Sequence, residues 1–179
     1  MFKVVYIVLI SAIAIYFGTG GFIILQNEQN YEKAITLVEK EVTYQGIKFY
    51  NKEVMKSSKQ QDLIYKFYPY AEVMPATLSF MITAICFGIL GAVGVGVNNS
   101  IIRGIKFHEY KNLLLVPAQG GFIGLIVIGI CYTIPVFLTN ENTTLKPITI
   151  VILSLFGGVF YMNFYEWFLK SINKIISKK

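Results

Sequence analysis

Four stretches of the chain are almost continuously apolar, and polar segments separate them. The first stretch, Val4 to Leu25, contains no charged residue. A helix of this length rises about 1.5 Å per residue and crosses a hydrocarbon layer of about 30 Å. The other stretches run from about Pro75 to Val97, from about Leu113 to Leu138 and from about Pro147 to Leu169. The pattern predicts an all-α membrane protein with four transmembrane helices.

The composition favours the same environment. Of the 179 residues, 55% are hydrophobic and 15% are charged, and the mean hydropathy is +0.58, whereas soluble domains carry about 25% charged residues. A cleaved signal peptide is the competing interpretation of the first stretch, because Ala12-Ile13-Ala14 has the small residues of a cleavage site. Apolar sequence continues from Ile15 to Leu25, so we expect a transmembrane helix instead.

The polar segment between the first two apolar stretches predicts a small, mostly helical insertion. Its first part has apolar residues on one face of an amphipathic helix: Tyr31, Ala34, Ile35, Val38 and Val42. Gly46 then interrupts a short extended or turn stretch. A second helix is expected with Ser57 or Ser58 as its cap and with its end at Pro69. We therefore divide the chain into a first transmembrane helix (1–25), an extracytoplasmic segment (26–72) and a three-helix transmembrane unit with a basic connection and tail (73–179).

The basic residues predict the orientation. The formal net charge is +6, and the surplus flanks the apolar stretches at Arg103, Lys106, Lys111, Lys170, Lys174, Lys178 and Lys179. Basic residues are enriched in cytoplasmic loops, so we expect a multi-pass protein of the bacterial inner membrane with both termini in the cytoplasm. These residues are candidate contacts for lipid headgroups or for a soluble cytoplasmic partner. Direct nucleic-acid binding is the weaker interpretation, because no basic fold module accompanies them.

Glycines are concentrated in the second apolar stretch. The sequence ICFGILGAVGVGV, residues 85–97, resembles a phosphate-binding loop, but such a loop needs a preceding strand and a Lys-Ser/Thr pair or a distal acid, and none of these is found here. In lipid, small residues at every fourth position let helix backbones approach one another. We therefore predict that the small residues pack helices together: Ala84, Gly88, Gly91, Ala92, Gly96, Gly120, Gly124, Gly157 and Gly158.

Two amides and one carboxylate fall inside the expected spans. Gln119 and Asn163 each lie about six residues from the basic end of their span, and Glu166 lies one turn nearer the surface, four residues before Lys170. Polar groups at membrane depth are costly unless they have partners. They are expected either to hold helices together, with a Glu166–Lys170 ion pair, or to line a polar path through the membrane.

Little in the sequence points to catalysis, to a cofactor or to a metal. His108 is the single histidine and lies in the basic connection, where it is either a pH-sensitive group or a solvated interfacial side chain. Cys86 and Cys131 lie in apolar stretches, without metal-ligand spacing. We expect no enzyme activity and no cofactor.

The last hundred residues, with FGILGAVGVGV, PAQGGFIGLIVIGI and SLFGGVFYMNFYEWFLKSI, resemble small bacterial inner-membrane proteins with glycine-rich spans. A four-span protein of this size with both ends inside is also similar to the membrane subunit of the Kiwa anti-phage defence system. That resemblance implies a homo-oligomeric membrane sensor that holds a cytoplasmic DNA-binding effector. It assigns no catalytic residue.

The sequence therefore carries two functional hypotheses. The first is a non-enzymatic scaffold or sensor subunit that contacts membrane lipids, associates with itself through its glycine surfaces and recruits a soluble cytoplasmic partner. The alternative is a small oligomeric ion channel or transporter, with Gln119, Asn163 and Glu166 along its path.

Overall fold

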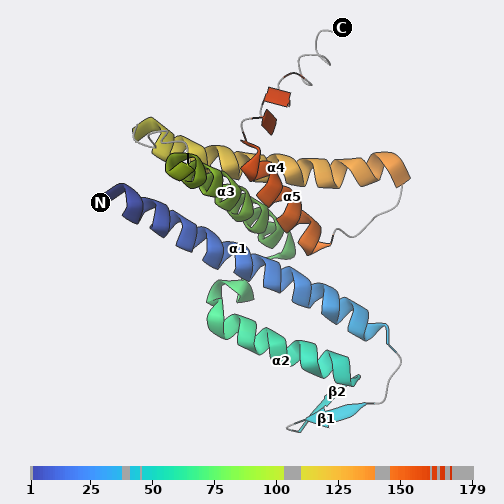
Figure 1. Ribbon diagram of the computed structural model, residues 1–179. Helices are drawn as coiled ribbons and strands as arrows, with labels where there is room; N and C mark the ends of the chain where they lie inside the picture. Colours follow the sequence, from blue (N-terminus) through green and yellow to red (C-terminus); the bar gives the residue numbers. More distant parts are fainter. Residues whose placement is uncertain are drawn as a thin grey trace.

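The computed structural model describes residues 2–37, 41–44, 46–102, 110–139, 146–161, 163–164, 166–167 and 170. Its elements are α1 (Phe2–Ile35), β1 (Val42–Tyr44), β2 (Ile47–Phe49), α2 (Lys52–Phe67), the short 3-10 helix η1 (Pro69–Glu72), α3 (Ala76–Ile102), α4 (Tyr110–Thr139) and α5 (Pro147–Val159). In Figure 1, α1 lies between two groups of elements: α3, α4 and α5 on one side, and α2 with the hairpin on the other. We call the described residues between α1 and α3 the insertion.

Three of the described helices are long and apolar enough to cross a membrane: Val4–Ile35 in α1, Ala76–Ser100 in α3 and Leu114–Cys131 in α4. The chain is therefore mostly helical, with three candidate membrane helices. α5 has 13 residues, fewer than the roughly 20 that a span needs. Beyond it, the N–H of Phe164 donates to the carbonyl of Phe160 at 2.8 Å. The fourth span stays a prediction.

α1 is longer than expected, and the separate amphipathic helix that we predicted after Leu25 does not form. Tyr31, Ala34 and Ile35 belong to α1 itself. Val38 lies outside the described residues, and Val42 begins β1 instead of ending a helix. The physical reason is that no glycine or proline follows Gly21 within α1, and extending a helix costs much less than nucleating a new one.

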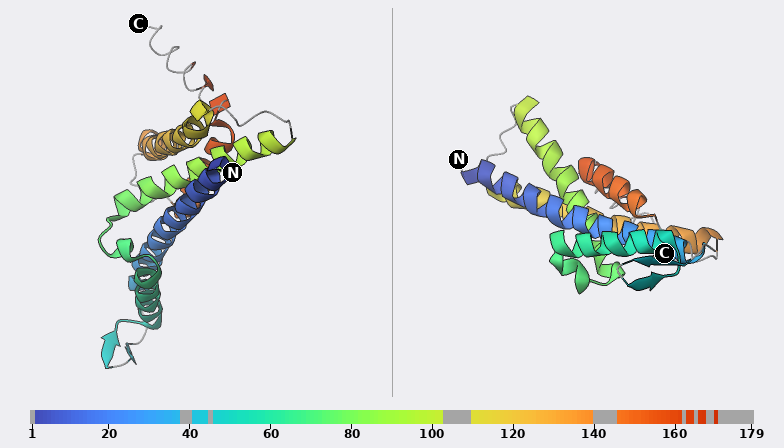
Figure 2. Two further views of the ribbon diagram at one scale, coloured as in Figure 1. Left: turned by 90° about the vertical axis from the view of Figure 1, so that its left-hand side faces the viewer. Right: turned by 90° about the horizontal axis from the view of Figure 1, so that it is seen from below.

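The expected turn at Gly46 is confirmed. β1 and β2 pair antiparallel, with Tyr44 opposite Ile47 and Val42 opposite Phe49. Gly46 has a φ of 80°, a left-handed conformation that glycine adopts without steric cost. Figure 2 shows the hairpin projecting beyond the helices at one end of the molecule.

α2 begins earlier than expected, and its cap is Asn51 instead of Ser57 or Ser58. The N–H of Val54 donates to Oδ1 of Asn51 at 2.8 Å, which satisfies one of the free donors at the helix start. Ser57 lies inside α2 and is buried. The expected end of this helix is confirmed, because α2 stops at Phe67 and Pro69 begins η1.

The connection between the second and third spans is shorter than expected. Residues 98–102 continue α3, and α4 already begins at Tyr110. Nothing in 98–102 breaks a helix, so the i to i−4 hydrogen bonds run on past the apolar stretch. The rest of the connection, residues 103–109, lies outside the described part of the chain, and so does the predicted polar turn at residues 140–145.

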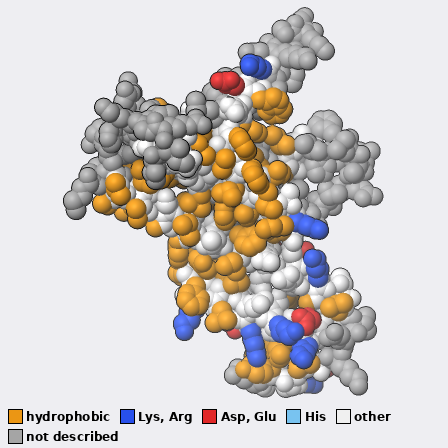
Figure 3. Space-filling view, in the orientation of Figure 1, with side chains coloured by type: hydrophobic (Ala, Val, Ile, Leu, Met, Phe, Trp, Pro, Cys, Tyr) orange, Lys and Arg blue, Asp and Glu red, His pale blue; other side chains and the backbone are white. Residues whose placement is uncertain are grey.

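α3 is the central helix of the bundle and packs against α1, α4 and α5. The buried core around it includes Ala84, Ala92, Ile123, Val127 and Ile150. Large apolar side chains also remain exposed, especially along α1 and α5, as lipid-facing side chains would. In Figure 3 the face over the helix bundle is largely hydrophobic, and charged side chains gather mostly around the insertion.

Candidate functional site

α3 and α4 cross with their backbones in direct contact. A Cβ atom added to Gly88 would collide with the carbonyl oxygen of Gly120, and one added to Gly120 would collide with the carbonyl of Gly88. One turn along, a Cβ on Gly124 would collide with the backbone of Ala84. In lipid, such close backbone approach supplies much of the attraction between helices.

α5 packs against α3 in the same way. A Cβ on Gly91 would collide with the carbonyl oxygen of Leu155, and a Cβ on Gly158 would collide with the carbonyl oxygen of Gly88. Gly157 faces α4, where a Cβ would lie 2.8 Å from Cγ2 of Ile123. Gly88 therefore meets both neighbouring helices at one point.

The small residues predicted to pack helices together lie at these crossings, and their contacts are made by helices of the same chain. Ala84 and Ala92 are fully buried, and Gly96 is also buried. By contrast, a Cβ on Gly94 or Gly129 would meet nothing within 4 Å. The glycines at the crossings are therefore engaged inside the chain, and self-association would need a different surface.

The three predicted intramembrane polar residues are all exposed. Gln119 lies on α4, whereas Asn163 and Glu166 lie beyond the end of α5. None of them forms a hydrogen bond or an ion pair with another residue of the described ranges, so the expected Glu166–Lys170 pair is not formed there. The described structure does not gather them into one polar site.

Most of the predicted basic contacts fall where the structure gives no description. Arg103, Lys106, Lys174, Lys178 and Lys179 lie outside the described residues, as does His108. Lys111 lies in the first turn of α4, and the backbone alone is described there. Lys170 is exposed.

Three buried hydroxyl groups form a feature that the sequence analysis missed. Ser79, Thr83 and Ser154 are fully buried, and their side-chain oxygens have no hydrogen-bond partner among the described residues. The hydroxyl of Thr83 occupies the place where a Cβ of Gly21 would be, so it lies in the contact between α1 and α3. The available signal was the spacing of Ser79 and Thr83, four residues apart on one face of an apolar helix.

Buried polar contacts attach the insertion to the C-terminal end of α1. The hydroxyl of Ser57 donates to Oδ1 of Asn27 at 3.1 Å. Asn51 donates through Nδ2 to the carbonyl of Ala34 at 2.6 Å and to that of Leu37 at 3.1 Å. The same side chain therefore caps the start of α2 and donates to free carbonyl groups at and just beyond the end of α1.

A cluster of aromatic rings attaches the other end of the insertion to α1. The ring centroids of Tyr16 and Tyr68 are 5.2 Å apart, and those of Phe17 and Tyr70 are 5.1 Å apart. The Tyr16 hydroxyl also donates to the carbonyl of Phe67 at 3.1 Å. Burial raises the pKa of Tyr70 to about 12, because the charged phenolate loses its hydration.

Gly20 makes this aromatic contact close. A Cβ on Gly20 would collide with the hydroxyl of Tyr70 and would lie 2.6 Å from Cδ1 of Tyr68. On the adjoining face, a Cβ on Gly18 would lie 3.0 Å from the Cβ of Cys86 in α3. Gly20 therefore contacts the insertion on one face of α1, and Gly18 contacts α3 on another face.

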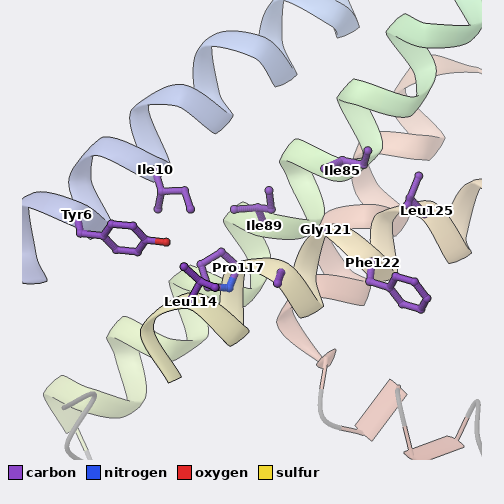
Figure 4. A pocket seen from close by; sticks show the side chains of 10 residues that line it. Tyr6, Ile10, Ile85, Ile89, Leu114, Pro117, Gly121, Phe122 and Leu125 are labelled. Atoms are coloured by element: carbon purple, nitrogen blue, oxygen red, sulfur yellow. The ribbon is translucent and has the colours of Figure 1, made fainter. Parts of the chain in front are cut away.

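An apolar groove of about 470 Å³ lies between α1, α3 and α4. Figure 4 shows Tyr6 and Ile10 on one side of it, Ile85 and Ile89 at its back, and Pro117 and Phe122 on α4. Its lining is almost wholly hydrocarbon and carries no charged group. Such a groove suits a hydrocarbon chain, and the hydroxyl of Tyr6 is the one polar side-chain group in its lining.

Within the ranges that the structure describes, no group of three or more His, Cys, Asp or Glu side chains lies close enough to hold a metal ion. Cys86 and Cys131 are buried free thiols. No protein-family model, no curated protein and no solved structure matches the chain. The resemblance to the Kiwa membrane subunit therefore stays a prediction.

Proposed function

We propose that the protein is a non-enzymatic scaffold or sensor subunit of the bacterial inner membrane, which associates with itself and recruits a cytoplasmic partner. The continuity of α1 is the observation that supports this function best. α1 has 34 residues, which corresponds to a rod of about 50 Å at 1.5 Å per residue. This length exceeds a hydrocarbon layer of about 30 Å, so α1 would connect an outward insertion with the cytoplasmic side.

The insertion is attached to α1 at two places, so we expect the insertion and α1 to move as one rigid body. Asn51 and Ser57 bind the outer end of α1, and the aromatic cluster binds its middle. Against α3, in contrast, α1 presents Gly18 and Gly21. Packed helices can slide or tilt past each other by small amounts. A displacement of the insertion would then reach the other end of α1.

Self-association would use apolar surface that the chain itself leaves uncovered. Val4, Val8 and Leu9 on α1, and Leu153 and Phe156 on α5, are exposed. Membrane lipid covers such side chains in a monomer, and a second copy would cover them in an oligomer.

The cytoplasmic partner would bind the basic connection around Arg103 to Lys111 and the basic tail. Because of the resemblance to the Kiwa membrane subunit, we further propose that this partner is a DNA-binding effector in anti-phage defence, and this extension rests on that resemblance alone.

The decisive experiment interrupts α1 between its membrane part and its outer part. Gln26 is exposed in α1, next to Asn27. Proline at position 26 removes a backbone hydrogen bond and costs about 3 kcal/mol in a helix interior, whereas alanine at the same position preserves the helix. We expect Gln26→Pro to abolish the response of a co-purified cytoplasmic partner to perturbation of the cell surface, and Gln26→Ala to preserve it.

Deletion of residues 171–179 should remove the partner while the oligomer, measured by mass photometry in nanodiscs, persists. A monomeric protein that captures no partner from its own host would contradict the proposed function. So would a partner response that survives Gln26→Pro unchanged.

The channel alternative draws on one observation. Gln119 is exposed on a helix apolar enough to cross the membrane, and a polar side chain facing lipid is costly. The backbone contacts at Gly88, Gly120 and Gly158 leave little room between α3, α4 and α5, so any polar path would lie between copies. Ion flux in liposomes that Gln119→Ala changes, with Asn99→Ala as control, would favour a channel over a scaffold.

A further inference from the structure

A second cavity lies where α1, α2 and η1 meet, next to the start of α3. It has a volume of about 520 Å³, within the range of roughly 300 to 1,000 Å³ found for small-molecule sites. Its polar lining residues are Asn27, Glu28, Tyr31, Gln61, Tyr65 and Glu72. Unlike the apolar groove, this cavity combines polar groups from three elements with an apolar floor.

The charged side chains that line this cavity are all acidic. Glu28 comes from α1 and Glu72 from η1. Neither forms an ion pair with any residue that the structure describes. Glu32 lies one turn beyond Glu28 on α1 and adds a further negative charge. The like charges of Glu28 and Glu32 repel one another, and a bound cation would offset that repulsion.

Two tyrosine rings add a second kind of cation-binding group. Tyr31 belongs to α1 and Tyr65 to α2, so they stand on different walls of the cavity. Tyr65 is held in place by Gln61, whose Nε2 donates to the tyrosine hydroxyl at 2.6 Å. The faces of aromatic rings attract ammonium groups, and aromatic cages are a common way to bind them.

The same residues argue against a metal ion. Calcium and magnesium need several oxygen ligands at about 2.0 to 2.6 Å, and the described acidic side chains do not converge as such a group. Ile24, Ile64 and Ala71 supply hydrocarbon surface in the same cavity. Separated carboxylates, aromatic rings and apolar surface suit a larger organic cation.

We propose that this cavity binds an organic ammonium group through Glu28, Glu72, Tyr31 and Tyr65. The ammonium belongs either to a free amine or to a lipid headgroup such as phosphatidylethanolamine, because the cavity adjoins Pro75 and Ala76, where the chain enters α3. A bound ammonium draws α1, α2 and η1 together. Its role as a signal rests on the proposed function, whereas its binding does not.

The first test measures a free ammonium ligand. The full chain is placed in nanodiscs of phosphatidylglycerol and titrated with choline by calorimetry. Wild type should bind choline, and Glu28→Gln and Glu72→Gln should each weaken the binding by up to about fivefold, the range expected for one partly exposed ion pair. Asp62→Asn is the matched control, because Asp62 is exposed on α2 and does not line the cavity.

The aromatic part of the site has its own matched pair. Tyr65→Phe keeps the ring and loses the hydroxyl, whereas Tyr65→Leu loses the ring. Choline binding should survive the first change and weaken severalfold in the second. Equal thermal unfolding temperatures of the variants exclude a loss of fold as the cause.

The second test identifies a lipid source. In nanodiscs of mixed phosphatidylethanolamine and phosphatidylglycerol, native mass spectrometry should show phosphatidylethanolamine retained by wild type and Asp62→Asn but released by the Glu28→Gln, Glu72→Gln double variant. Absence of both choline binding and selective lipid retention would overturn the proposed site, and so would binding that all variants share. Oligomer formation and partner capture are measured separately, so failure here leaves the proposed function standing.

Discussion

Asn51 joins the two helices of the outer part of the molecule by donating its amide N–H group to the carbonyl of Ala34 at 2.6 Å. The side chain is fully buried, and its oxygen accepts the N–H of Val54. One side-chain amide group therefore caps both the end of α1 and the start of α2, and it holds the insertion against α1.

Asn51→Ala should release the insertion from α1. The change removes the cap and leaves buried carbonyl groups without a partner, which together cost about 2 to 4 kcal/mol. Hydrogen exchange should become faster in residues 46–67 and stay unchanged in α3. Asn51→Asp keeps the cap oxygen but cannot donate to Ala34, so its effect should be intermediate. Equal exchange in all three proteins would show that the Asn51 contacts do not hold the insertion.

Gly88→Ala should loosen the helix bundle, because its Cβ would collide with the Gly120 carbonyl oxygen. Overpacking of this kind costs about 1 to 3 kcal/mol. The buried thiols of Cys86 and Cys131 provide the measurement, since unfolding in detergent exposes them to a thiol-reactive dye. Gly94→Ala is the control in the same helix, where a Cβ meets open space and alanine should be neutral or stabilising by up to about 1 kcal/mol. Equal unfolding temperatures for the Gly88 and Gly94 variants would refute the close crossing.

Tyr70 should make the protein sensitive to alkaline pH. Its pKa in the folded protein is about 12, raised from 10.0 by burial. The unfolded chain therefore loses this proton first, so stability is fully present below pH 10 and falls as the pH rises from 10 toward 12. Tyr70→Phe keeps the ring without the ionising group and should lose less stability over that interval. Parallel pH dependence of the two proteins in thermal unfolding would contradict this assignment.

Thr83→Val should be tolerated in spite of the full burial of this residue. The Thr83 hydroxyl has no partner among the described residues, so replacing it with a methyl group of similar shape removes an unsatisfied polar atom. The expected change in unfolding free energy is between zero and a stabilisation of about 1 kcal/mol. Thr133→Val is the comparison, since the Thr133 hydroxyl donates to the carbonyl of Gly129 at 2.6 Å. A clear destabilisation by Thr83→Val would show that the hydroxyl has a bonding partner, such as a buried water.

Features that depend on a few neighbouring residues could be predicted from the sequence. The long apolar helices follow from stretches of about 20 consecutive apolar residues. The turn at Gly46 needs a residue that adopts a left-handed conformation, and Pro69 has no N–H with which to continue α2. Asn51 could not be found in this way. Its value as a cap depends on Ala34, which a different helix brings to it.

The candidate site shows the same division. The four-residue spacing of small residues, such as Gly88 with Ala92 and Gly120 with Gly124, indicated where helices can pack closely, but the sequence does not say whether the partner helix belongs to the same chain. For Gln119 and Asn163, counting residues from the helix ends gave a depth in the membrane but not a direction around the helix. Both side chains are exposed in the structure. The direction of Gln119 is determined by how α4 packs on α3, and Asn163 lies beyond the end of α5.

The double contact at Gly88 also determines the order in which the bundle can be completed during synthesis. α3 leaves the ribosome before either of the helices that cover this glycine, so its bare backbone first faces lipid or the insertion machinery. Gly120 arrives with the next helix, and Gly158 arrives later with α5. The two faces of α3 are therefore covered in sequence, and the packed bundle exists only after α5 has also left the ribosome.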